Sequence, residues 1–151
     1  MSKPRAPTGG SPPGATGSAL DAALSRVGDR WSLLIVDALL AGPRRFNELA
    51  DAVPGIASNV LSQRLKRLEA QGLVVARPYS RRPARLAYEL SAGGAELAGA
   101  VRLLARWGAR LGDEAQPARH EVCGTEMEVR WYCPTCGRTV ERGEASELRH
   151  L

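Results

Sequence analysis

The chain has 151 residues and a formal net charge of +5, with 44% hydrophobic and 25% charged residues. This length accommodates one domain of ordinary size, or one small domain plus a minor module, and excludes two full-sized cores. The positive charge is concentrated in residues 18–110, which carry +6, whereas residues 111–151 carry −3. The middle of the chain is therefore the part suited to an anionic partner such as nucleic acid.

No segment has the run of about 18 apolar residues that a transmembrane helix needs, and the first residues lack the apolar stretch of a signal peptide. We therefore expect a cytoplasmic protein without a membrane partner. Residues 1–17 contain four prolines and four glycines and little that could be buried. This composition predicts a disordered N-terminal tail.

Caps and helical spacing of apolar residues predict three helices in the next segment. Ser18 is expected to cap a first helix that ends at Gly28. A second helix runs over 31–41, before a Gly-Pro pair. After a short extended link, Asn47 is expected to cap a third helix that a Pro-Gly pair ends at residue 54.

A fourth helix over 58–71 follows after a short turn, so the two helices form a helix-turn-helix. Ala57 has no side-chain acceptor, and Ser58 is expected to cap this helix instead. The β-prone runs 73–77 and 85–90 flank a basic tip and predict a hairpin, which after a helix-turn-helix is a wing.

The helix over 58–71 has a leucine face and an opposite polar face that could enter a major groove. Asn59 and Gln63 have the amide geometry for a bidentate contact with adenine, and Ser62 suits base or phosphate. Lys66 and Arg67 are expected to meet the DNA backbone. The role of Arg64, at the border of the two faces, stays open.

The basic residues beside this helix are further candidates. Arg81 and Arg82 at the wing tip are expected to contact the minor groove or a phosphate. Arg44 and Arg45 could equally touch phosphate or brace the fold. A helix starting at Ser91 and running through Trp107 has a longer apolar stripe than so small a domain needs, which predicts a partner helix.

Taken together, these motifs resemble the HxlR group of winged-helix regulators, within the broader MarR-like class. The motifs that carry the resemblance are Gly28-Asp-Arg-Trp31, Gly42-Pro-Arg-Arg-Phe-Asn-Glu-Leu49, Pro54-Gly-Ile56, Leu61-Ser-Gln-Arg-Leu65, Gly72-Leu-Val74 and Tyr88-Glu-Leu90. The resemblance implies a homodimer built from the first and last helices, with two recognition helices on a pseudo-palindromic operator. Many relatives have a redox-sensing cysteine near the start of the first helix, where this chain has Ser18.

The C-terminal part contains two pairs of metal-ligating residues with the same two-residue gap, His120 with Cys123 and Cys133 with Cys136. Three thiolates and one imidazole suit a tetrahedral Zn²⁺ site. A glycine, Gly124 or Gly137, follows each pair, where the turn is expected to need unusual dihedral angles. We expect a structural zinc in a zinc-ribbon-like module over 117–151, with a strand over 126–132. His150 is an alternative fourth ligand, and a redox-active dithiol is the rival interpretation of the second pair.

The sequence thus predicts an α+β fold, mainly helical with a small β-hairpin, in which a winged helix-turn-helix over 18–110 precedes the zinc-ribbon-like module. We expect a sequence-specific regulator that binds double-stranded DNA as a homodimer. We do not expect an enzyme, because no nucleophile with a base and no phosphate-binding loop is evident. The alternatives are a protein-interaction adaptor and a regulator switched by Cys133 and Cys136. A small-molecule effector is compatible with this class, and no residue pattern identifies one.

Overall fold

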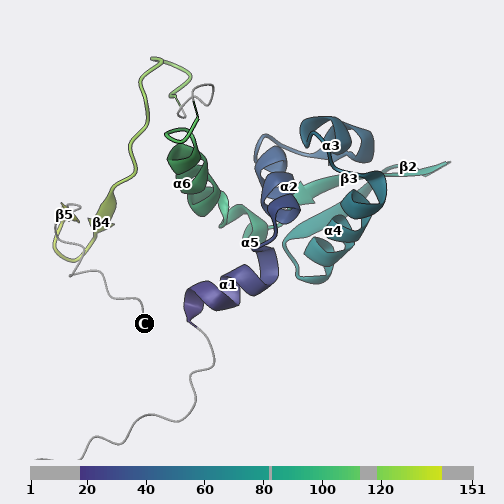
Figure 1. The fold of residues 1–151 in the computed structure, drawn as a ribbon, viewed down its shortest axis with the longest axis horizontal. Coiled ribbons are helices and arrows are strands. Elements are labelled where there is room, and N and C mark those ends of the chain that lie inside the picture. Colours follow the sequence, from purple (N-terminus) through teal and green to yellow (C-terminus); the bar gives the residue numbers. More distant parts are fainter. Residues whose placement is uncertain (1–17, 82, 113–118, 141–151) are drawn as a thin grey trace, which may run out of the picture.

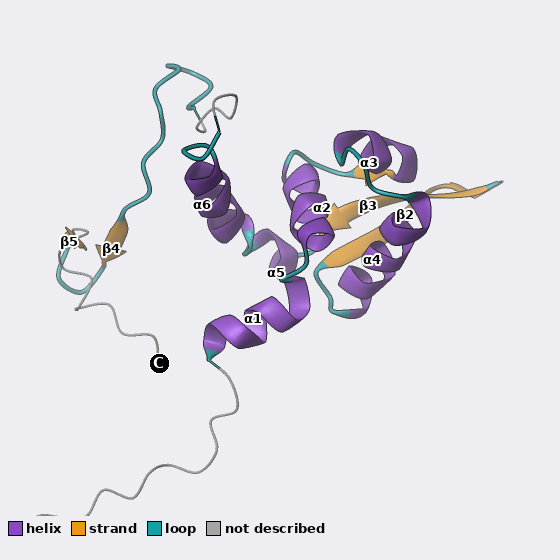
Figure 2. Cartoon of the chain, in the orientation of Figure 1, coloured by secondary structure: helices purple, strands orange, loops and turns teal. Residues whose placement is uncertain are grey.

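The computed structural model describes residues 18–81, 83–112 and 119–140 (Figure 1). The helices in these ranges are α1 (Ala19–Val27), α2 (Arg30–Leu40), α3 (Phe46–Ala52), α4 (Ser58–Ala70), α5 (Ala92–Ala95) and α6 (Ala98–Gly108). The strands are β1 (Arg44–Arg45), β2 (Val74–Arg81), β3 (Ala84–Leu90), β4 (Trp131–Cys133) and β5 (Arg138–Val140). This is the expected α+β fold, with the helix-turn-helix of α3 and α4 beside a β-hairpin (Figure 2). The expected disordered tail, residues 1–17, lies outside the described residues.

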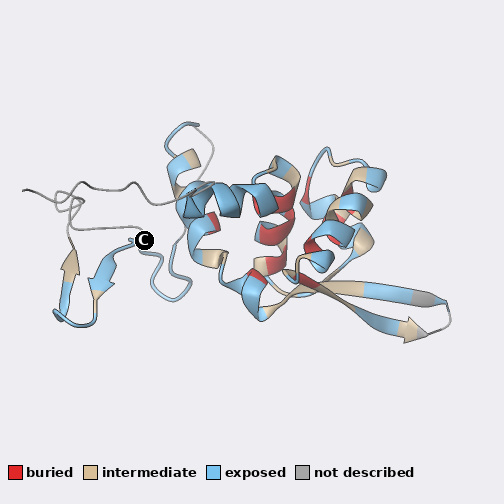
Figure 3. Ribbon diagram, turned by 90° about the horizontal axis from the view of Figure 1, so that it is seen from below, coloured by how far each residue is buried: buried red, intermediate tan, exposed pale blue. Residues whose placement is uncertain are grey.

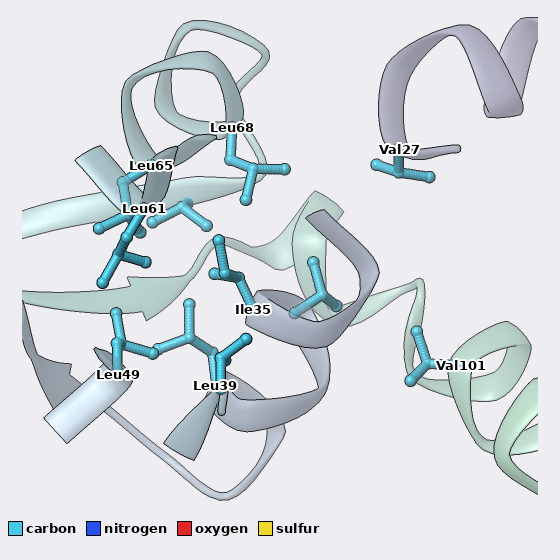
Figure 4. Packing of buried hydrophobic residues seen from close by; sticks show 11 residues of the cluster. Val27, Ile35, Leu39, Leu49, Leu61, Leu65, Leu68 and Val101 are labelled. Carbon is cyan, nitrogen blue, oxygen red and sulfur yellow. The ribbon is translucent and has the colours of Figure 1, made fainter. Parts of the chain in front are cut away.

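The hydrophobic core lies where α2, α3 and α4 meet the sheet. Ile35 of α2, Leu49 of α3, and Leu61, Leu65 and Leu68 of α4 are at most 1% exposed and point toward one another (Figure 4). Full burial of a leucine or isoleucine side chain stabilises a fold by roughly 1.5–3 kcal/mol. The leucine face predicted for α4 is therefore confirmed as the face that attaches this helix to the domain, and Figure 3 shows its other side exposed.

The sheet has the strand order β1-β3-β2, and all its pairs are antiparallel. The short link before α3 is a strand, because Arg44 pairs with Tyr88 of β3. The predicted wing is confirmed, but its strands extend farther toward the tip than predicted, to Arg81 on β2. An irregularity in register between Pro78 and Ser80 lets the hairpin continue past the proline.

Two of the four predicted helix caps, Ser18 and Ser91, are confirmed, and two, Asn47 and Ser58, are wrong. The Ser18 hydroxyl accepts a hydrogen bond from the Asp21 N–H at 3.1 Å, as expected. In α4, however, Ala57 is the N-cap and Ser58 is the first helical residue, so no side chain caps the recognition helix. In α3 the N-cap is Arg45, whose N–H donates to the Glu48 carboxylate at 2.6 Å.

The long helix predicted from Ser91 through Trp107 is divided into α5 and α6. The Leu97 N–H donates to the carbonyl of Gly94, three residues back, at 3.1 Å, which tightens the turn between the two helices. Gly93 and Gly94 are poor helix formers, which weakens the helix at this point. Ser91 is confirmed as a cap, since its hydroxyl accepts the Gly94 N–H at 3.0 Å.

Candidate nucleic-acid interface

The polar face of α4 is free of the core and accessible to a ligand. Asn59, Gln63 and Lys66 are exposed, and Ser62 is half-buried at the edge of the face. The burial of the leucine face fixes which side of the helix is presented, because the two faces alternate with the helical period. The structure thus brings these four predicted contacts together on one outward surface.

The two arginines of α4 at positions 64 and 67 bind elements of the protein itself. Arg64 Nε donates to the Asp29 carboxylate at 2.9 Å, and an Arg67 nitrogen donates to the Ser25 carbonyl at 2.6 Å. Asp29 also caps α2 by accepting hydrogen bonds from the backbone N–H and the hydroxyl of Ser32, at 3.1 Å and 2.6 Å. Arg64 therefore anchors the recognition helix to the start of α2, and Arg67 ties it to α1. The sequence did not indicate either role.

These contacts change the acidity of the Asp29 carboxyl group. Its partial burial by itself would raise the pKa of Asp29. Hydrogen bonds from Ser32, together with the hydrogen bond and charge of Arg64, outweigh that effect and lower the pKa below its ordinary value. The carboxylate form of Asp29 is thus the form that holds α2 and α4 together.

The wing extends the basic surface away from the helices (Figure 1). Arg81 is the last residue of β2, while its side chain and the whole of Arg82 lie outside the described residues. Farther down the hairpin, Arg77 forms an ion pair across the strands with Glu89. Arg85 is exposed near the start of β3.

The neighbouring residues Arg44 and Arg45, which the sequence left equivalent, have different surroundings. Arg44 Nε donates to the Ala38 carbonyl at 2.8 Å, so this arginine braces the C-terminal end of α2. The Arg45 guanidinium lies over the Tyr79 ring, 4.4 Å from its centre. Arg45 thereby faces a hollow of about 450 Å³ between the start of α3 and the wing. The hollow is lined by Arg45, Phe46, Asn47, Glu48, Tyr79, Arg85 and Leu86.

Large apolar side chains remain exposed on α1 and α6. In α1, Leu20 and Leu24 are 66% and 52% exposed, and in α6, Leu104 and Trp107 are 52% and 60% exposed. Of the predicted stripe only Val101 is buried in the core. Both helices lie at the end of the domain opposite the wing tip (Figure 1).

The two predicted ligand pairs of the C-terminal segment lie in turns with the same local form. The Gly124 N–H donates to the His120 carbonyl at 2.7 Å, and the Gly137 N–H donates to the Cys133 carbonyl at 2.9 Å. Both glycines have a positive φ, 69° and 66°, at which any other side chain would be strained. The unusual dihedral angles predicted for these glycines are thus confirmed.

Two thiols in these turns, those of Cys123 and Cys133, have a pKa lower than that of free cysteine. Hydrogen bonds with Thr125, followed by that with His120, lower the pKa of Cys123 to about 7. Hydrogen bonds from Cys136, with a smaller one from Thr135, lower the pKa of Cys133. The Cys123 sulfur lies 3.3 Å from His120 Nδ1. A lowered thiol pKa favours the thiolate, which is both the metal ligand and the reactive form.

The structure does not bring the two pairs together. Among the described residues, no three His, Cys, Asp or Glu side chains are placed to hold a metal ion. The turn at 120–124 and the β4–β5 hairpin lie at opposite ends of an extended segment (Figure 1). The strand predicted over 126–132 is largely wrong, because β4 begins at Trp131 and pairs with β5. His150 lies outside the described residues.

Comparison with known proteins agrees with the class that this fold defines, a winged helix-turn-helix regulator. Residues 26–116 match the family described as HxlR-like helix-turn-helix. The chain belongs to this family. None of the described helices is long and apolar enough to cross a membrane.

Similar sequences carry the name of transcriptional regulators. The chain is 37% identical over 132 residues to the uncharacterized HTH-type transcriptional regulator Rv3095 of Mycobacterium tuberculosis, covering 82% of this chain and 80% of that protein. It is 32% identical over 88 residues to the HTH-type transcriptional regulator YodB of Bacillus subtilis, covering 58% of this chain and 79% of that protein.

Solved structures support the same class. The HTH-type transcriptional regulator ytcD superposes with a TM-score of 0.59 at 35% identity, over 63% of this chain and 97% of that chain. The reduced form of the redox regulator HypR superposes with a TM-score of 0.60 at 29% identity, over 64% of this chain and 95% of that chain. The chain is thus a transcriptional regulator with a helix-turn-helix DNA-binding fold.

Proposed function

We propose that this protein regulates transcription by sequence-specific binding to double-stranded DNA, acting as a homodimer on a pseudo-palindromic operator and without catalysis. The observation that carries the proposal is the outward polar face of α4 beside a basic wing. Asn59 and Gln63 can read base edges in the major groove, and Ser62 and Lys66 can contact base or backbone. Arg81 and Arg82 would reach the adjacent groove from the wing. Such a regulator would work in the cytoplasm.

Arg67 keeps a place in this proposal only as a secondary contact. Its guanidinium is 3.9 Å from Asp29 and donates to the Ser25 carbonyl, so it can turn only part of its donors toward a phosphate. We therefore expect Lys66, which is exposed on the same helix, to make the stronger backbone contact.

The experiment that tests DNA reading is selection of bound fragments from random DNA by the purified full-length protein, followed by footprinting. We expect one preferred inverted repeat. In the selected site, Gln63→Ala should relax discrimination at one or two base positions by roughly 1–3 kcal/mol, while Lys66→Ala should weaken binding to all sequences about equally. If no sequence is preferred over bulk DNA at physiological salt, the adaptor interpretation replaces this one.

The exposed apolar faces of α1 and α6 support the proposal of a homodimer. A second copy of the chain would cover both faces, since a two-fold axis brings the same surface of each subunit together. Because these helices lie opposite the wing tip, a dimer formed through them would leave both recognition helices accessible. Their spacing on one face of DNA would be roughly 34 Å, one helical turn.

For the C-terminal segment we propose one structural Zn²⁺ per chain, bound by His120, Cys123, Cys133 and Cys136. Three thiolates and one imidazole are a zinc donor set, and each pair lies in a glycine-ended turn. In the first turn the Cys123 sulfur is 3.3 Å from His120 Nδ1. Closure of the hairpin onto the first turn would bring the pairs together around the ion. The zinc would supply stability that so short a segment cannot obtain from burial.

A redox switch through Cys133 and Cys136 is the second candidate, favoured by the lowered pKa of Cys133 and by the likeness to the redox regulator HypR. The described residues at the start of α1, where Ser18 is the N-cap, contain no thiol. A switch of this kind would therefore have to act from the C-terminal segment.

A further inference from the structure

We propose that the hollow between the start of α3 and the outer half of the wing, formed by Arg45, Tyr79 and Arg85, binds a backbone phosphate of the DNA. This inference deepens the proposed function and rests on it. It assigns a contact to residues outside the recognition helix and outside the wing tip. It also gives Arg45 a role different from that of its neighbour Arg44, which donates a hydrogen bond to the Ala38 carbonyl.

The charge of the hollow suits a phosphate. Arg45 and Arg85 contribute two guanidinium groups, and within the described parts of the chain neither of them forms an ion pair. The carboxylate of Glu48 also lines the hollow, but it accepts the backbone N–H of Arg45 at 2.6 Å. An excess of positive charge therefore remains. Guanidinium groups present forked donors that match phosphate oxygens.

Tyr79 holds Arg45 in position before any ligand arrives. The guanidinium lies 4.4 Å from the ring centre, a distance at which the ring face attracts a cation. A contact with the ring face uses none of the guanidinium N–H donors in a hydrogen bond, so they stay available to an anion. Because the side chain is already ordered, binding would cost less conformational entropy than it would for a free surface arginine.

The position of the hollow fits the path of a DNA strand. In a helix-turn-helix the second helix enters the major groove while the first crosses the sugar-phosphate backbone. Here α3 is the first helix, and the hollow lies between its start and the hairpin that would reach the next groove. The strand that separates the two grooves would therefore pass the hollow.

A small-molecule effector fits the hollow less well. Effector pockets are mostly apolar and enclose most of the ligand surface. This hollow is open and mostly polar. Phe46 and Leu86 are the lining residues whose side chains carry no polar group. Its lining instead presents an amide and two guanidinium groups beside the single carboxylate of Glu48, and these donors suit an oxyanion.

The test measures binding of the full-length protein to the selected operator and to random duplex by fluorescence anisotropy over a series of salt concentrations. The plot of log affinity against log salt has a slope of about −0.9 per phosphate contact on duplex DNA. We expect Arg45→Ala combined with Arg85→Ala to reduce the magnitude of this slope by about one per bound chain, because one phosphate contact is lost. Affinity for both duplexes should fall by the same factor, so the specificity ratio should not change.

Two further variants separate a phosphate site from a general loss of charge. Arg30→Ala removes another stacked arginine, which lies 4.8 Å from the Trp31 ring centre and outside the hollow, and should leave the slope unchanged. Tyr79→Phe should bind like the wild type, whereas Tyr79→Leu should lose part of the slope although no charge is removed.

The proposal is overturned if the double variant, shown by circular dichroism to be folded, keeps the wild-type slope, or if Arg30→Ala lowers the slope as much. Because random duplex is measured in parallel, the salt slopes test the phosphate site even if the protein prefers no operator. Failure of the proposed function would show as equal affinity for operator and random DNA. Failure of this inference would show as an unchanged slope with the preference intact.

Discussion

Asp29 joins three parts of the DNA-binding domain through one carboxylate. It caps α2 through Ser32 and forms an ion pair with Arg64 of α4 at 2.9 Å. It also lies 3.9 Å from Arg67, which reaches α1. The orientation of the recognition helix therefore depends on a residue that touches no DNA in the proposed complex.

The lowered pKa of Asp29 predicts a pH-dependent contribution to stability. A carboxyl group whose pKa is lower in the folded than in the unfolded state stabilises the fold above the unfolded value, and this contribution is lost as the pH falls through the folded value. Asn is an equally good helix cap, so Asp29→Asn mainly removes the ion pair with Arg64. We expect it to lower the free energy of unfolding at about pH 7 by roughly 0.5–1 kcal/mol.

Urea unfolding at several pH values measures this effect. The difference between Asp29→Asn and the wild type should shrink as the pH falls below 3.8, the ordinary pKa of the carboxyl group, and through its lowered pKa in the folded state, where the wild-type carboxylate is itself protonated. Asp37→Asn, on the exposed face of α2, should change stability by less than about 0.5 kcal/mol. A destabilisation by Asp29→Asn that is the same at every pH would contradict the role of the charge.

At the scale of elements, α5 can pack against the start of the hairpin only because Gly94 has no side chain. A Cβ added at Gly94 would lie 2.0 Å from the Leu73 carbonyl oxygen, a backbone atom that cannot move aside. A Cβ at the adjacent Gly93 would meet its nearest neighbour at 3.8 Å, which is ordinary contact. The two glycines are neighbours in one helical turn, yet only one of them is required by packing.

Gly94→Ala should therefore destabilise the domain by roughly 1–3 kcal/mol, because α5 must move away from the start of β2. Gly93→Ala should be neutral or stabilise by up to about 1 kcal/mol, since alanine is the better helix former. Thermal unfolding of the two variants makes the comparison. Equal effects of the two substitutions would show that α5 is not packed as described.

The proposed zinc site predicts what happens when one of its four ligands is removed. Elemental analysis of the purified protein should find about one zinc per chain, and Cys133→Ser should lower this sharply because one of four ligands is lost. Thr135→Ala, in the same turn but not a proposed ligand, should retain the metal. Chelation should unfold the segment after residue 119 while the helical signal of the domain with the buried core survives.

The rival interpretation makes the opposite prediction for the same samples. Protein that contains no metal and forms a reversible disulfide between Cys133 and Cys136, with a change in DNA affinity, would show that the segment is a redox switch. Mass spectrometry after alkylation distinguishes a free thiol from a disulfide in each case.

At the scale of the whole molecule, the domain has two ends with different surfaces. The wing and the recognition helix form one end, and the exposed apolar side chains of α1 and α6 form the other (Figure 1). The C-terminal segment approaches the second end, since Glu126 lies 3.9 Å from Arg106 of α6. Zinc binding and dimer formation would thus take place close together.

The proposed dimer should be disrupted by a charge on this surface. Leu104→Glu and Trp107→Glu would each place a carboxylate in an apolar interface, where an unpaired charge is costly. We expect both variants to be monomeric at micromolar concentration by light scattering, with a helical signal like that of the wild type. Val129→Glu, at an exposed apolar position in the extended segment, should stay dimeric. A monomeric wild type would refute the homodimer.

The sequence by itself determined the features whose causes are local. The cap at Ser18, the leucine face of α4, the hairpin after it and the positive φ of Gly124 and Gly137 each depend on residues a few positions apart. Such patterns follow from the helical period, strand propensity and backbone sterics, which do not need the rest of the chain.

Only the tertiary structure decided which basic side chains are available to DNA. Arg64 binds Asp29, 35 residues away, and Arg67 binds Ser25, 42 residues away, so no local pattern could reveal that both are occupied. Arg44 and Arg45 are adjacent and chemically identical, yet one braces α2 and the other stacks on Tyr79 of the wing. The partner of a long, flexible side chain is set by what packing brings within its reach.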